Sequence, residues 1–208
     1  MTTTKTVHVA LYDTLSDWEF GFATARLNLP HFQKRPGVFQ VRTVAATLDP
    51  ITTMGGLRIL PDTTLDRITP DDSALLLLSG SDTWTTGANR EFSAAARRWL
   101  DAGVPVAAIC GATIGLADEG LLDDRPHTGN AVEELSSVPN YRGQAHFRQE
   151  RAVRHDKLIT AGGASALEFA REILAELDVY EPAVLEAWYG LFSTGNPEWF
   201  GKLVAAAS

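Results

Sequence analysis

The chain has 208 residues, of which 45% are apolar and 21% charged, and its formal net charge is −8. This length fits one compact domain over residues 1–208, and no apolar run is long enough to cross a membrane. An acidic chain without clustered Lys and Arg is unsuited to a general nucleic-acid surface. We therefore expect small-molecule or protein partners, with no nucleic acid and no membrane.

The start of the chain, MTTTKTVHVALYD, has no extended apolar segment followed by a small-residue cleavage site. Cys110 is the only cysteine, so the chain cannot form an intrachain disulfide. Together these features predict a cytoplasmic location in a reducing environment.

The first half of the chain alternates between strand and helix patterns. Ser16 or Asp17 can act as the N-cap of its first helix, and the apolar spacing behind them is helical. The elements expected in this half are a strand at 5–12, a helix at 16–29, a strand at 38–46, an edge strand or hairpin within 55–68 and a nearly all-apolar strand at 73–80.

The second half continues the alternation with short connections. The expected elements are a helix at 89–103, a strand at 104–110, a helix at 112–122, a hairpin within 150–163 and helices at 164–177 and 182–192. This order predicts an α/β fold, a doubly wound and mostly parallel sheet flanked by helices on both faces. Ligands of such sheets bind outside the carboxyl ends of the strands, where Cys110 is expected.

The residues around Cys110 have the spacing of a nucleophile elbow. Ala108 and Ala112 are the small residues that a tight strand-to-helix turn needs two positions before and after its nucleophile. The amides at the start of the following helix favour a thiolate. A buried, inert cysteine is the alternative interpretation, and the spacing by itself leaves both open.

The segment AAICGATIGLADEGLLDDRPHTGN resembles the elbow region of the ThiJ/PfpI superfamily, the class I glutamine amidotransferase-like proteins. Four further stretches, DWEF, GGLRILPDTTLDRI, LLLLSGS and LITAGGASALEFA, resemble the family's N-terminal acidic position, middle hairpin, PGG loop and last core strand with its helix. The resemblance covers most of the chain and implies a flavodoxin-like, class I glutamine amidotransferase-like fold.

Carried over to this sequence, the resemblance implies that Cys110 is the nucleophile and Glu19 the carboxyl beside it. Two adjacent anions repel, so a shared proton favours a protonated Glu19 that donates to the thiolate. Asp17 is the alternative carboxyl, although we expect it to cap the helix. The family's oxyanion hole is formed by backbone N–H groups.

The positions matching this oxyanion hole are Gly111, Gly80 and Ser81.

The sequence also departs from the family's pattern. Gly111 stands where peptidase-like members have a histidine, and no His-x-Glu triplet occurs, so peptidase and glutamine amidotransferase activities are disfavoured. Asn130 stands where deglycase-like members have a histidine. His127 and His146 remain as candidate general bases bordering the pocket.

No metal-ligand spacing and no Gly-x-Gly-x-x-Gly after the first strand occur, so we expect neither a metal nor a cofactor.

An aromatic-rich helical extension is expected at about 181–208. We expect its aromatic side chains to cover the core; lining the pocket entrance and forming a dimer contact are the alternatives. A homodimer is the expected assembly.

These residues support three functions. The first is a hydrolase or hydratase that uses Cys110 and Glu19 on a small electrophile of unknown identity, and the pattern is nearest to isonitrile hydratase-like members. The second is a redox-responsive stress or chaperone-like protein in which a small oxidant converts Cys110 to a sulfinate. The third is a non-catalytic binding domain.

Overall fold

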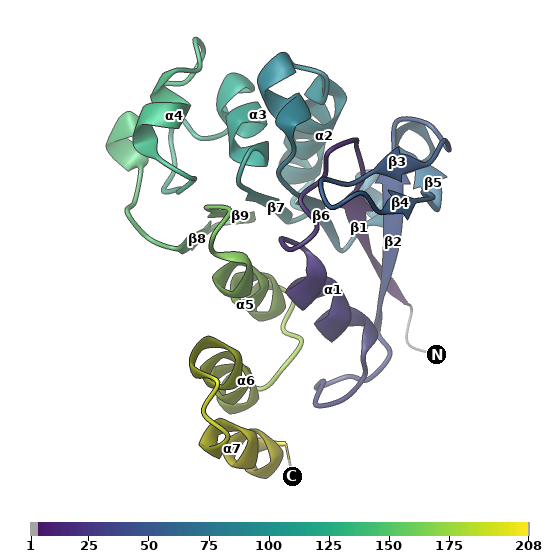
Figure 1. Cartoon of the computed structure of the whole chain (residues 1–208), viewed down its shortest axis with the longest axis vertical. Coiled ribbons are helices and arrows are strands. Elements are labelled where there is room, and N and C mark those ends of the chain that lie inside the picture. Colours follow the sequence, from purple (N-terminus) through teal and green to yellow (C-terminus); the bar gives the residue numbers. More distant parts are fainter. Residues whose placement is uncertain (1–3, 208) are drawn as a thin grey trace.

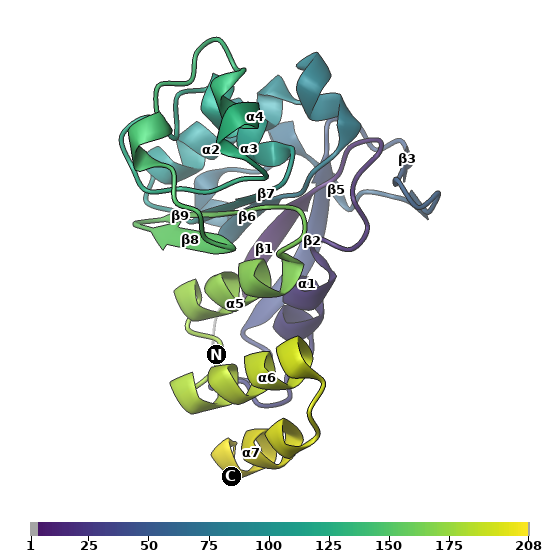
Figure 2. The ribbon, with the colours of Figure 1, turned by 60° about the vertical axis from the view of Figure 1, so that its left-hand side comes forward.

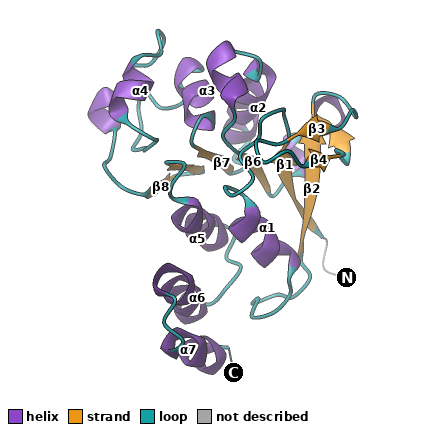
Figure 3. Ribbon diagram, viewed as in Figure 1, coloured by secondary structure: helices purple, strands orange, loops and turns teal. Residues whose placement is uncertain are grey.

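A computed structural model describes residues 4–207 of the protein, which form a layered α/β structure (Figures 1 and 3). Its central sheet has seven strands in the order β5-β2-β1-β6-β7-β9-β8. All neighbouring strands are parallel except β8 and β9, which form an antiparallel pair. The strands of this sheet are β1 (Lys5–Ala10), β2 (Phe39–Ala45), β5 (Thr63–Thr64), β6 (Leu75–Leu78), β7 (Val106–Ile109), β8 (Ala152–His155) and β9 (Leu158–Ala161). The predicted doubly wound, mostly parallel sheet is confirmed.

Helices cover both faces of the sheet, and the last two form a further layer (Figure 2). On one face lie α2 (Arg90–Asp101) and α3 (Ala112–Asp118), with the short α4 (Val132–Ser136) beside them. On the other face lie α1 (Gly21–Asn28) and α5 (Ala166–Glu176). Beyond α5 follow α6 (Pro182–Thr194) and α7 (Glu198–Ala206).

The all-leucine strand β6 explains why the sheet is buried on both sides. Leu76 and Leu78 belong to the apolar cluster under α2 and α3. Leu75 and Leu77 belong to the cluster under α1 and α5. Successive side chains of a strand point to opposite faces, so a strand covered by helices on both sides reads as a continuous apolar run.

The first helix begins later than its sequence pattern indicates. Helix α1 starts after Phe20, and no side chain caps it. The prediction that Ser16 or Asp17 is its N-cap is therefore wrong. The amide of Ser16 donates to the Gly80 carbonyl at 2.9 Å, which holds residues 16–20 as a loop across the strand ends. The helix expected at 112–122 is also shorter, because α3 ends at Asp118.

The range 55–68, where an edge strand or hairpin is expected, holds two short strands. One is β5, the edge strand of the main sheet. The other is β4 (Arg58–Ile59), which forms a hairpin with β3 (Ile51–Thr52), a strand that lies before this range. Its turn is tied to the first loop of the chain, since the Gly55 amide donates to Asp17 Oδ2 at 2.7 Å. The side chain of Thr53, and to a smaller extent this contact, lower the pKa of Asp17. Asp17 therefore anchors the hairpin and does not cap a helix.

The aromatic C-terminal helices divide between core and surface. Trp188 is 1% exposed and packs in the cluster of α1 and α5, as expected of a residue that covers the core. Phe192 and Phe200 are 45% and 55% exposed. Among residues 4–207, no helix combines the length and the apolar character needed to span a bilayer.

Candidate active site

Four segments from distant parts of the sequence meet at the carboxyl ends of neighbouring parallel strands. Glu19 lies in the loop that follows β1, Gly80 follows β6, Cys110 follows β7 and Gly163 follows β9. These four strands are adjacent in the sheet, so their ends lie along one edge. This is the edge at which doubly wound sheets bind ligands.

Cys110 occupies a strained turn between β7 and α3. Its φ is +58°, in the left-handed region that a non-glycine residue adopts at an energetic cost. The turn is held by backbone bonds: the Cys110 amide donates to Ala161 O at 2.9 Å, and its carbonyl accepts from the Thr113 amide at 3.0 Å. The Thr113 hydroxyl donates to the same carbonyl at 2.7 Å. This is the strand-to-helix turn that the small-residue spacing predicts.

The carboxyl of Glu19 is completely buried beside Cys110. Its Oε2 accepts from the Gly80 amide at 2.5 Å, whereas its buried Oε1 has no hydrogen-bond partner within residues 4–207. A Cβ placed on Gly80 would lie 2.9 Å from Cys110 Sγ and 3.0 Å from Glu19 Oε1. The sulfur and the free carboxyl oxygen therefore converge on this glycine, which leaves no room for a side chain.

Burial raises the pKa of Glu19 to about 7, and the hydrogen bond from the Gly80 amide acts in the opposite direction. Burial and the charge of Glu19 raise the pKa of Cys110 to about 11. Hydrogen bonds from Asn130 and the Gly111 amide act in the opposite direction. The expected lowering of the thiol pKa by the start of α3 is therefore outweighed. A thiolate beside an ionised Glu19 would place two negative charges together, so the thiolate costs less when Glu19 is protonated.

Asn130 and Trp18 hold the peptide of Gly163 against the sulfur. Asn130 donates through Nδ2 to Cys110 Sγ at 3.5 Å, and its Oδ1 accepts from the Gly163 amide at 2.9 Å. The indole N–H of Trp18 donates to the Gly163 carbonyl at 3.0 Å. A Cβ on Gly163 would lie 2.8 Å from Sγ.

The sequence patterns did not predict that Trp18 or Gly163 contacts the site. Two features could have indicated it: the Gly-Gly pair after the last strand and the aromatic residue directly before Glu19.

The backbone amides named as oxyanion donors differ in what they contact. The Gly80 amide is engaged by Glu19 Oε2. The Ser81 amide donates no hydrogen bond within the described part of the chain. A Cβ on Gly111 would lie 3.1 Å from Ser81 O and 3.5 Å from Ser81 N, so the elbow and the Ser81 loop are in contact. Of the Gly80 and Ser81 amides, that of Gly80 is therefore already occupied by a protein acceptor, whereas that of Ser81 is not.

The histidines do not complete a catalytic pair with Cys110. His127 is completely buried, with Nδ1 2.8 Å from the Arg125 carbonyl and Nε2 2.7 Å from the Tyr141 hydroxyl. Burial lowers its pKa, so it is a neutral core histidine and the general-base interpretation is wrong. His146 contributes its backbone carbonyl to the His127 amide, and within residues 4–207 its ring makes no hydrogen bond to Cys110 or Glu19.

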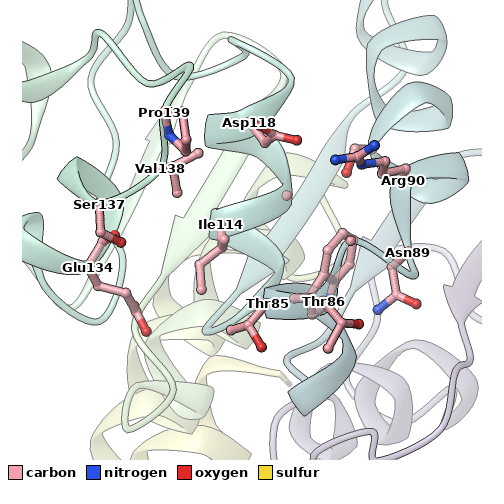
Figure 4. Close-up of a pocket in the computed structure, with 14 residues that line it drawn as sticks. Thr85, Thr86, Asn89, Arg90, Ile114, Asp118, Glu134, Ser137, Val138 and Pro139 are labelled. Carbon is pink, nitrogen blue, oxygen red and sulfur yellow. The ribbon is translucent and has the colours of Figure 1, made fainter.

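A hollow lies between α3, α4 and the 3-10 turn Asp82–Thr86 (Figure 4). Its volume is about 400 Å³, and Ile114, Glu134 and Trp84 contribute to its lining. The indole N–H of Trp84 donates to Ser79 O at 2.9 Å, so this wall supports the loop that carries Gly80. Cys110 does not line this hollow. No cluster of three metal-ligating side chains occurs in the described residues.

The fold and the cysteine turn define a class of α/β proteins with a cysteine elbow, and comparisons with known proteins specify the family. The sequence matches the model of the DJ-1/PfpI family over residues 5–176. The chain belongs to this family, as the resemblance to the ThiJ/PfpI superfamily predicted.

Individual relatives extend over nearly the whole chain. The chain is 40% identical over 203 residues to "Uncharacterized protease YoaZ" of Bacillus subtilis (strain 168), covering 97% of each protein. A crystal structure of a thiJ/pfpI family protein from Bacillus anthracis is similar with a TM-score of 0.92 and 40% identity, covering 99% of this chain and 98% of that one. The DJ-1 superfamily protein Atu0886 from Agrobacterium tumefaciens has a TM-score of 0.82 and 31% identity, covering 92% and 99%.

Proposed function

We propose that the protein is a cysteine-dependent enzyme that acts on a small electrophile, with Cys110 as nucleophile and Glu19 as the group that moves its proton. The observation that carries this proposal is the convergence of Cys110 Sγ and the unbonded Glu19 Oε1 on one glycine at the strand ends. A buried carboxyl with a pKa of about 7 can both accept and return a proton near neutral pH.

The chemistry for an amide substrate follows from these positions. Ionised Glu19 takes the thiol proton, and Sγ bonds to the carbonyl carbon as the C=O π electrons move onto oxygen, facing the Gly111 and Ser81 amides. The adduct then expels the amine, which leaves with the proton from Glu19. Water cleaves the resulting thioester, and this step releases the acid and restores the thiol.

The site geometry does not favour peptide hydrolysis by a Cys-His pair, although the word "protease" occurs in the name of a relative. The ring of His127 is bonded to Arg125 and Tyr141, and the amide of Asn130, which is not a base, contacts Cys110. Proton transfer therefore rests on Glu19.

The test is turnover on a panel of isonitriles, amides, 2-oxoaldehydes and a casein-derived peptide. Cys110→Ser should abolish turnover, and Glu19→Gln should lower kcat by about 10²- to 10⁴-fold, the usual contribution of a positioned acid-base group. Glu186→Gln removes an exposed carboxyl on α6 and is the matched control. Turnover that survives in Cys110→Ser, or none on any class, would contradict the proposal.

A redox role for the same pair is the second candidate, because the Glu19 carboxyl beside Sγ can donate to a sulfinate oxygen. Two equivalents of hydrogen peroxide would oxidise the thiol to the sulfinic acid and be reduced to two equivalents of water. Mass spectrometry after mild peroxide treatment should then find a stable addition of two oxygens at Cys110 in the wild type. In Glu19→Gln the oxidation should stop earlier or continue to the sulfonate. An unmodified Cys110 excludes this candidate.

A further inference from the structure

The hollow between α3, α4 and the 3-10 turn Asp82–Thr86 is large enough to hold a small molecule. Its volume of about 400 Å³ equals roughly thirteen water volumes. The apolar side chains of Ile114 and Val138 form part of its lining, and polar side chains surround them. An occupant can therefore combine a compact apolar body with a polar group.

Glu134 of α4 contributes an unpaired carboxylate to this lining. Its Oε2 is shielded from solvent and has no hydrogen-bond partner, and no ion pair within residues 4–207 includes Glu134. Buried polar groups are normally paired, and an unpaired carboxylate oxygen that is removed from water is costly. A hydrogen-bond donor with positive charge, carried by an occupant of the hollow, would compensate this carboxylate.

The hydroxyl groups beside Glu134 offer acceptors and no free donors. The hydroxyls of Thr85 and Thr86 each donate to the backbone carbonyl three residues earlier, at 2.9 and 2.8 Å. The Ser137 hydroxyl likewise donates to the carbonyl of Glu134 at 2.6 Å. A hydroxyl has one proton and two lone pairs, so in this arrangement these three oxygens can only accept from an occupant.

The charged side chains of the lining are one cation, Arg90, and two carboxylates, Asp118 and Glu134. In Figure 4 Arg90 and Asp118 point toward each other, and Glu134 lies on the other side of the hollow. Asp118 Oδ1 also accepts from Asn140 Nδ2 at 3.0 Å. The charges of Arg90 and Asp118 offset each other, which leaves the charge of Glu134 without a counterpart.

A negative charge surrounded by acceptors matches an ammonium group, which has three donors and no acceptor. A metal ion is a poorer match, because no group of three metal-ligating side chains occurs in the described part of the chain. We propose that this hollow binds a small primary amine in its ammonium form, with the ammonium group on Glu134 and the apolar body against Ile114 and Val138. Cys110 does not line the hollow, so the inference is independent of the proposed function.

Cyclohexylamine and cyclohexanol test this directly, because they have nearly the same shape and only the amine is charged at neutral pH. Isothermal titration calorimetry with the full chain measures the Kd of each. We expect the amine to bind about ten-fold more tightly than the alcohol, the contribution of one hydrogen bond to a charged group. Equal Kd values for the two probes, or no binding of the amine, would overturn the inference.

Two glutamate variants locate the binding. Glu134→Gln keeps the size of the side chain and removes its charge, so the preference for the amine should disappear. Glu133→Gln is the matched control, because Glu133 is the preceding residue of α4, is exposed and does not line the hollow. Its preference should equal that of the wild type. A preference that survives in Glu134→Gln, or that falls equally in both variants, would contradict a site at Glu134.

A third variant supplies the ammonium group from the chain itself. Position 137 lines the hollow and lies three residues after Glu134, within reach of its carboxylate for a long side chain. Ser137→Lys should therefore occupy the carboxylate and remove the preference for the amine over the alcohol. An undiminished preference in this variant would overturn the inference.

Discussion

Replacing Glu19 with glutamine should make the protein more stable at neutral and alkaline pH, although it removes a residue of the active site. The carboxyl is completely buried, and its pKa rises from 4.5 to about 7 on folding. A shift of this size corresponds to about 3 kcal/mol of preference for the protonated form. Glutamine keeps the oxygen that accepts from Gly80 and never has to be buried as an ion.

The direction of the pH dependence follows from the proton count. Between pH 4.5 and about 7 the native chain retains a proton on Glu19 that the unfolded chain has released. The wild-type free energy of unfolding therefore falls as pH rises through this window and levels off above it. Glu19→Gln lacks this loss, so its stability advantage over the wild type should grow by about 3 kcal/mol between pH 4.5 and pH 8.

Urea unfolding at both pH values, followed by the fluorescence of the five tryptophans, measures this difference. Other titrating groups contribute to both proteins and cancel in the comparison. Glu186→Gln is the control for loss of an exposed carboxyl. A stability difference between Glu19→Gln and the wild type that is the same at pH 4.5 and pH 8 would show that Glu19 is not held in a raised-pKa environment.

Two further substitutions probe the contacts of the thiol. Gly163→Ala places a Cβ 2.8 Å from Sγ, so it should lower the free energy of unfolding by about 1–3 kcal/mol and suppress alkylation of Cys110. Gly21→Ala, where nothing lies within 4 Å of the added Cβ, is the control and should have neither effect. Equal unfolding curves for the two variants would refute the packing argument. Asn130→Ala removes a hydrogen bond that lowers the pKa of Cys110, so the pH midpoint of Cys110 alkylation by iodoacetamide should move upward. An unchanged or lower midpoint would mean that the 3.5 Å contact between Asn130 and Sγ is not a hydrogen bond.

The sequence by itself determined the layered fold and the place of the cysteine. The alternation of apolar runs with helically spaced apolar residues was enough to predict the doubly wound sheet, because strands buried on both faces must be apolar throughout. The small residues at positions 108 and 112 were enough for the turn at Cys110, since this turn is a local feature. The pairing of Glu19 with Cys110 needed the family resemblance, because 91 positions separate them in the chain.

Only the tertiary structure decided which polar residues reach the thiol. Asp17 and His127 have side chains suited to the site, yet one anchors the hairpin turn at Gly55 and the other is buried against Tyr141. Asn130 reaches the sulfur together with the peptide of Gly163. Which side chains reach the thiol depends on how the loops that follow separate strands pack against each other. Strand order decides which loops are neighbours at the end of the sheet, and local sequence patterns do not encode strand order.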